Sequence, residues 1–154
     1  MALKEAVEMA KKGLSYAKRT KYKEALAYYN KALTIDPNYA EGLFLRAAAL
    51  IESGRYKEGL LDCDKAIAIN QNLSEAWSKK ALALFYLERI EDALAASTRA
   101  STLNANDVTA WYIKGVCLDE MGRSDEAQEA YGKSLELEII LDMHADAKKI
   151  RQQR

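Results

Sequence analysis

A 34-residue period runs through most of the 154-residue chain. Small residues return at that interval at Gly13, Ala47, Ala81 and Gly115, and a large apolar residue follows each of them three places later. Self-similarity at a fixed interval of a few tens of residues is typical of repeat proteins, in which each repeat packs against its neighbours. The period therefore predicts a stack of four similar units.

Each unit is predicted to contain two helices. Large apolar side chains recur at offsets of three and four residues in both halves of a unit, which places them on one face of a helix. The single proline and seven glycines are too few for the frequent turns of a β-sandwich or barrel. We expect eight helices, at about residues 6–19, 22–35, 40–53, 56–69, 74–87, 90–103, 108–121 and from 124 onward.

About eight landmark positions recur in register in the four units. In the first unit they hold Met9, Gly13, Tyr16, Thr20, Ala25, Tyr29, Ala32 and Asp36-Pro37. The pattern resembles the tetratricopeptide repeat over residues 6–141, although the fourth unit lacks the terminating Asp-Pro. The resemblance implies an all-α fold, a right-handed superhelical solenoid of antiparallel helix pairs. We expect a single domain over residues 1–154, with repeats at 6–39, 40–73, 74–107 and 108–141.

The turn inside each unit falls at a different kind of residue. Gly54 and Gly122 suit the left-handed conformation that often ends a helix, because glycine has no Cβ to strain. Thr20 and Glu88 stand at the equivalent places of units one and three. We expect these two residues to adopt a different turn geometry.

The last helix is predicted to be long, because nothing between Leu137 and Ile150 breaks a helix. Apolar residues at 140, 143, 147 and 150 keep a spacing of three and four. A terminal repeat has no neighbour and needs a cover with a polar outer face. We therefore expect residues 142–154 to be a capping helix segment that packs on the fourth repeat.

No constellation of residues typical of an enzyme is present in the sequence. His144 is the only histidine, and the phosphate-binding motifs GxxxxGK[ST] and GxGxxG are absent. Cys63 and Cys117 lack CxxC spacing and are predicted to be buried structural thiols, with Asp62 and Asp64 solvated on either side of the first. We predict a protein that is not an enzyme and holds neither a metal nor a cofactor.

The lengths of the apolar runs and the distribution of charge predict where the protein is located and which partners it does not bind. No stretch is apolar for long enough to predict a membrane span, and the first residues lack the apolar core of a secretory signal, so we expect a cytoplasmic protein. The net charge is +5 for residues 1–31, −8 for residues 32–142 and +3 for residues 143–154. This asymmetry is too weak, and too poor in clustered arginine, to predict nucleic-acid binding.

The resemblance places the binding surface on the concave side of the solenoid, lined by the first helix of each pair. Five positions of each first helix are expected to face this groove. Among them and their neighbours, the candidate groove residues are Leu14, Lys18, Phe44, Ala48, Ser78, Lys79, Leu82, Tyr86, Tyr112, Val116 and Glu120. Phe44, Tyr86 and Tyr112 are the preferred ligand contacts, whereas Leu14 and Val116 are equally compatible with packing between helices.

The composition of this groove indicates an apolar ligand. Its centre is apolar and aromatic, with Lys11 and Lys18 at one end and Asp119 and Glu120 at the other. Such a surface suits an apolar anchor or an amphipathic helix, with the charges setting its direction. The leading hypothesis is a non-enzymatic scaffold or adaptor that binds a peptide or helix of a partner protein.

Two alternatives remain. In the first, the chain self-assembles, because the apolar terminal helix of one molecule enters the groove of another. In the second, the chain is a co-chaperone that binds the acidic C-terminal tails of heat-shock chaperones. The resemblance maps the carboxylate clamp of such co-chaperones to five positions, of which only Lys79 has the required charge; the five are Ala10, Leu14, Leu45, Glu75 and Lys79.

Overall fold

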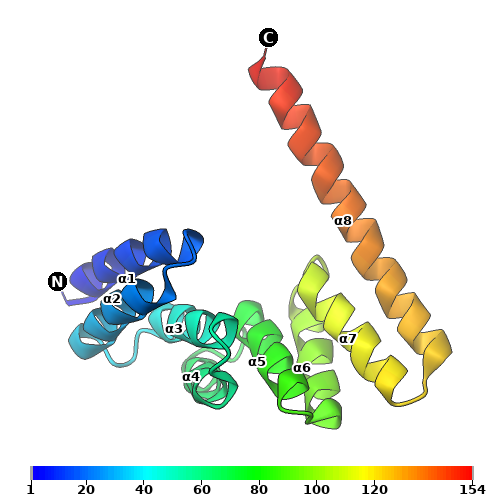
Figure 1. Ribbon diagram of the computed structural model, residues 1–154, viewed down its shortest axis with the longest axis horizontal. Helices are drawn as coiled ribbons and strands as arrows, with labels where there is room; N and C mark the ends of the chain where they lie inside the picture. The colour runs from blue at the N-terminus through cyan, green and yellow to red at the C-terminus, as the bar shows by residue number, and fades with distance from the viewer. Residues whose placement is uncertain (1, 154) are drawn as a thin grey trace.

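The computed structural model describes residues 2–153 and not the side chain of Ile150, so the first and last residues of the predicted domain lie outside the described residues. The described chain forms eight α-helices and no strand (Figure 1). The prediction of eight helices is confirmed. Their bounds are α1 Ala2–Lys18, α2 Tyr22–Ile35, α3 Ala40–Glu52, α4 Tyr56–Ile69, α5 Ser74–Tyr86, α6 Ile90–Leu103, α7 Val108–Glu120 and α8 Ser124–Gln152.

Small residues let the two helices of each pair approach closely. A Cβ atom built on Gly13 would lie 2.6 Å from Cε1 of Tyr29, and one built on Gly115 would lie 2.7 Å from Cδ1 of Tyr131. Ala47 and Ala81, at the same place in the middle repeats, are fully buried. A larger side chain at these positions would overpack the pair, at a cost of about 1–3 kcal/mol.

The stack of helix pairs curves, so that its first and second helices lie on different faces. The first helices of successive repeats contact one another, as α1 with α3, α3 with α5 and α5 with α7. Within residues 2–153 the backbones of α2, α4, α6 and α8 do not approach each other in this way. The first helices therefore line the concave side of the solenoid, and the second helices form its convex side (Figure 1).

All four turns inside the repeats have the same geometry. Gly54 and Gly122 have positive φ angles of 83° and 75°, as predicted. Thr20 and Glu88 also have positive φ angles, of 59° and 62°, so the expectation of a different geometry is wrong. In each turn the next backbone N–H donates to a carbonyl five residues earlier, as Arg89 does to Leu84 at 2.9 Å. This hydrogen bond at the end of the helix requires one residue in the left-handed backbone conformation, whatever its side chain.

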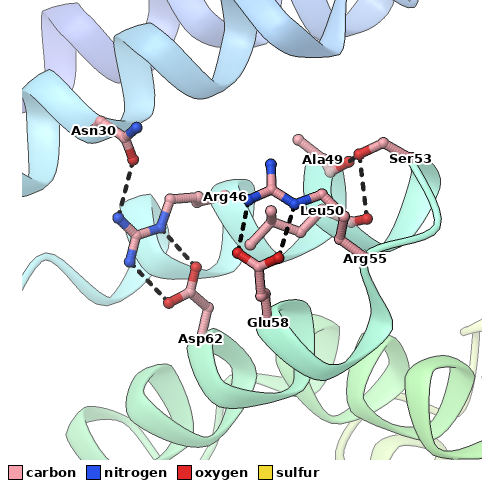
Figure 2. Close-up of polar contacts among 8 residues, drawn as sticks. All are labelled: Asn30, Arg46, Ala49, Leu50, Ser53, Arg55, Glu58 and Asp62. Atoms are coloured by element: carbon pink, nitrogen blue, oxygen red, sulfur yellow. Dashed lines mark hydrogen bonds and ion pairs between the residues drawn. The ribbon is translucent and has the colours of Figure 1, made fainter. Parts of the chain in front are cut away.

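A polar contact joins the first two repeats on their convex side (Figure 2). Arg46 of α3 donates to both carboxylate oxygens of Asp62 in α4, and its remaining amino group donates to the side-chain oxygen of Asn30 in α2. Cys63 and Cys117 are buried, as predicted, and Asp64 is exposed. Asp62 is buried, however, so the prediction that it is solvated is wrong. The buried carboxylate is tolerated because the guanidinium neutralises it with two hydrogen bonds.

The last helix is continuous, as predicted, but its second half does not pack on the fourth repeat. All residues from 138 to 149 are exposed, and α8 extends well beyond the end of α7 (Figure 1). A helix without a break keeps its direction, so its second half cannot fold back over the repeat that its first half already contacts. The predicted packing of residues 142–149 as a cover is therefore wrong.

Candidate functional site

The concave side has an apolar centre formed by one position of each first helix. These residues are Leu14 of α1, Ala48 of α3, Leu82 of α5 and Val116 of α7, and all four are half-buried. Because they are spaced by 34 residues in a stack of equivalent helices, they form a row along the concave side. This row leaves part of each side chain available to a ligand.

A hollow of about 210 Å³ opens beside this row in the first two repeats. We call it the N-terminal hollow. It brings together three predicted groove residues, Leu14, Lys18 and Ala48, with further residues of α1 and α3 and with two tyrosines of α2. The full lining is Leu14, Ala17, Lys18, Tyr22, Tyr29, Leu45, Ala48, Ala49 and Glu52. Its size is small for a drug-sized ligand and suits one or two apolar side chains.

Two of the predicted groove residues, Tyr86 and Tyr112, are exposed tyrosines of first helices that lie outside the N-terminal hollow. Tyr86 of α5 is 52% exposed and stacks on Tyr56 of α4, with ring centroids 4.7 Å apart. Tyr112 of α7 is 56% exposed and its ring lies 5.8 Å from that of Tyr131 in α8. Tyr56 and Tyr131 belong to second helices, which is why a search of the first helices missed them. Their rings hold the exposed tyrosines in place without covering them.

Three other candidates take part mainly in packing. Phe44 is half-buried against the core cluster that contains Leu33 and Ile67, and Ser78 is buried. Leu82 packs against two clusters of the core. Phe44 is therefore a less accessible side chain than Tyr86 or Tyr112, the other two preferred contacts.

The charged candidates lie at the edges of the concave side. Lys18 and Glu120 are exposed, in the first and the fourth repeat. Lys79 of α5 has its amino group 3.5 Å from a carboxylate oxygen of Glu52 in α3, so this lysine already has an acidic partner. Burial, and then the charge of Asp119, raise the pKa of Tyr131 above its usual value. Asp119 and Glu120 are both exposed, so the end of α7 is acidic.

Comparison with known proteins identifies the repeat. Residues 13–54 match the family model described as "TPR repeat", and residues 78–139 match the one described as "Tetratricopeptide repeat". The chain belongs to the tetratricopeptide repeat family. Domains of this family generally mediate contacts between proteins, and they are generally not enzymes. No curated protein sequence matches this chain significantly.

Solved structures agree with the fold. A crystal structure of MamA has a TM-score of 0.78 at 20% identity, covering 90% of this chain and 81% of MamA. The first TPR domain of Spaghetti (RPAP3), bound to the HSP90 peptide SRMEEVD, has a TM-score of 0.75 at 27% identity, covering 77% of this chain and 94% of that one. The TPR domain of Arabidopsis OM64 has a TM-score of 0.75 at 23% identity, covering 78% and 99%.

Helix length and hydropathy together decide whether a helix could span a membrane. Among residues 2–153, no helix is both long enough and apolar enough to cross a bilayer.

Proposed function

We propose that this tetratricopeptide repeat domain is a scaffold or adaptor that binds an amphipathic segment of a partner protein along its concave side. One observation supports the proposal: the first helices supply most of the apolar N-terminal hollow and also carry the exposed Tyr86 and Tyr112. Aromatic and aliphatic anchors that enter a groove supply most of the energy in such complexes. The hollow would take an apolar anchor of the ligand, and the two tyrosines would pack on its apolar side.

The charges at the two ends favour one direction for the ligand. Lys11 and Lys18 are exposed at the α1 end, and Asp119 and Glu120 are exposed at the α7 end. A ligand with an acidic end over α1 and a basic end over α7 would have both ends next to opposite charges. Complementary charges of this kind set the register and the association rate more than the affinity.

The acidic-tail ligand of the RPAP3 domain fits this chain poorly. At the positions that the carboxylate clamp would use, Ala10 is buried, Leu14 and Leu45 are apolar, and Glu75 is an exposed acid. The remaining position, Lys79, is next to Glu52. An acidic tail would meet a single lysine and two carboxylates, so we propose a ligand whose affinity comes from apolar side chains.

Peptides selected from a random display library against the folded domain test this proposal. We expect selected sequences to carry large apolar residues at helical spacing, and their affinity to fall at least tenfold with Ala48→Glu or Tyr112→Glu. Leu61→Glu is the matched control for Tyr112→Glu, because Leu61 is an apolar residue of the second helix α4 and is about as exposed as Tyr112. The peptide SRMEEVD serves as the acidic probe and should bind weakly or not at all.

Circular dichroism of each variant separates loss of binding from loss of fold. Groove binding would be refuted if the selected peptides bound Ala48→Glu and Tyr112→Glu as well as the parent protein. A similar loss with Leu61→Glu would place the binding surface on the convex side instead.

A further inference from the structure

The N-terminal hollow is lined by two alanines at positions where later repeats have larger residues. Ala17 of α1 and Ala48 of α3 both line it. At the 34-residue spacing, Ala17 corresponds to Ile51 and then to Phe85, and Ala48 corresponds to Leu82. The interface between the first two repeats therefore has the smaller side chain at both positions.

The larger residues pack into the core between the later repeats. Ile51 is buried in a core cluster against which Leu82 also packs. Phe85 packs in the same way against the next core cluster. These side chains take up the space that Ala17 and Ala48 leave open between the first two repeats. The hollow is therefore a property of these two alanines rather than of the repeat itself.

The size of the hollow fits one large apolar side chain. Its volume is about 210 Å³, and a cavity of about 150 Å³ is enough to admit a benzene ring. Leucine and alanine side chains supply more than half of its lining residues, and Tyr22 and Tyr29 are also apolar over their rings. A leucine, methionine or phenylalanine side chain would fill this space, whereas an alanine side chain would leave most of it empty.

The charges at the hollow favour an acidic residue next to that side chain. Lys18 and Glu52 both line the hollow and are exposed. A carboxylate oxygen of Glu52 lies 3.5 Å from the amino group of Lys79, so the charge of Glu52 is already offset. The positive charge of Lys18 therefore predominates, and a carboxylate of the ligand would complement it.

We propose that the N-terminal hollow is the anchor site of the groove ligand and takes one leucine-, methionine- or phenylalanine-sized side chain with an acidic residue beside it. Ala17 and Ala48 are the residues that determine the size of this anchor, because a larger residue at either position would occupy the space that the anchor needs. This inference rests on groove binding as proposed above, and it adds the chemistry of the anchor and the residues that select it.

Coupling between the anchor and the two alanines tests this assignment. For a peptide selected from the display library on the parent protein, we expect one large apolar residue whose replacement by alanine weakens binding at least tenfold. The same replacement should weaken binding to Ala48→Leu or Ala17→Ile less than twofold, because the hollow is then filled by the protein itself. Such non-additivity is expected only of groups that contact one another.

The two variants are chosen so that the fold is kept. Each introduces the residue that the next repeat already has at the same position, Leu82 or Ile51, and circular dichroism verifies the helices. Ala27→Leu is the matched control for Ala48→Leu, because Ala27 is exposed on the second helix α2 and does not line the hollow. The tenfold loss should be unchanged in this control.

Charge reversal at Lys18 tests the acidic neighbour of the anchor. Peptides selected on Lys18→Glu should have a neutral or basic residue in its place, and selected peptides that keep the acidic residue would contradict the assignment.

The outcomes separate this inference from groove binding. Peptides that lose affinity with Tyr112→Glu, but whose alanine replacements cost as much on Ala48→Leu and Ala17→Ile as on the parent protein, would overturn the anchor site and leave groove binding intact. Selected peptides that bind Tyr112→Glu and Ala48→Glu as well as the parent protein would instead refute groove binding itself.

Discussion

Arg46 of α3 and Asp62 of α4 form a two-bond ion pair, with Nε 2.6 Å from Oδ2 and Nη2 2.8 Å from Oδ1. Asp62 is buried, and Arg46 also reaches Asn30 of α2 at 3.1 Å. The pair therefore joins three helices from two repeats (Figure 2). The ion pair of Arg55 with Glu58 lies nearby in the same view, but both of its side chains are about half exposed.

Removing the carboxylate of Asp62 should destabilise the domain much more than removing that of Glu58. Asp62→Ala leaves a partly buried guanidinium without its partner, which we expect to lower the free energy of unfolding by about 2–3 kcal/mol. Glu58→Ala breaks a solvent-exposed pair, so its effect on the free energy of unfolding should be much smaller. Urea unfolding of the two variants compares these values, and equal losses would show that burial of Asp62 is not what makes the contact strong.

Glu88→Gly should stabilise the domain. Glu88 has a φ angle of 62°, a conformation that costs a residue with a side chain about 1–2 kcal/mol. Glycine relieves this strain but gains conformational entropy in the unfolded chain, so we expect a net gain of about 0.5–1 kcal/mol. The measurement is the free energy of unfolding.

The reverse change at Gly54 is the matched control for this turn. A Cβ atom on Gly54 would meet no atom within 4 Å, so Gly54→Ala tests the backbone conformation alone. We expect it to destabilise the domain by about 1 kcal/mol. If Glu88→Gly were destabilising while Gly54→Ala was neutral, the left-handed turns would not be strained.

The two buried thiols should make the domain less stable at alkaline pH. Burial raises the pKa of Cys63 from 9.0 to about 12 and the pKa of Cys117 from 9.0 to about 11. Above pH 9 the thiols of the unfolded chain lose their protons while the folded ones keep them, so rising pH favours unfolding. This contribution is fully present well below pH 9 and is lost as the pH approaches the folded values.

For the two thiols together, we expect the free energy of unfolding to fall by about 2 kcal/mol between pH 9 and pH 10. The double variant Cys63→Ala, Cys117→Ala should be less stable at neutral pH, because each change removes buried volume, but its stability should fall less over this interval. Urea titrations at the two pH values measure both slopes. An identical fall in the two proteins would contradict the role of the thiols.

The repeat could be predicted from sequence because its evidence is spread over the whole chain. Gly13 and Gly115 mark the close approach of a helix pair, and the structure places a tyrosine ring against each of them. The conformation of Glu88 could not be predicted from its residue type, since the closure of the turn outweighs the preference of the side chain. The burial of Asp62 depends on Arg46, sixteen residues away on another helix.

The candidate site could be predicted only in part, because some of its contacts join different helices. The 34-residue spacing identifies the row that includes Leu14 and Ala48, which the structure brings into one hollow. Tyr56 and Tyr131 support the exposed tyrosines from second helices, and no single-helix pattern indicates such a contact. The apolar residues of α8 beyond Leu137 were visible in the sequence, but their orientation away from α7 depends on the angular position of Met143 relative to Ala130.

Amide chemical-shift mapping of a selected peptide on the isotope-labelled protein tests groove binding most directly. Groove binding predicts that the largest shifts lie on α1, α3, α5 and α7, near Leu14, Ala48 and Tyr112, and that Tyr112→Glu reduces them. The amides of α4 around Leu61 should change little. Shifts concentrated on α2, α4 and α6, with none along the first helices, would contradict it.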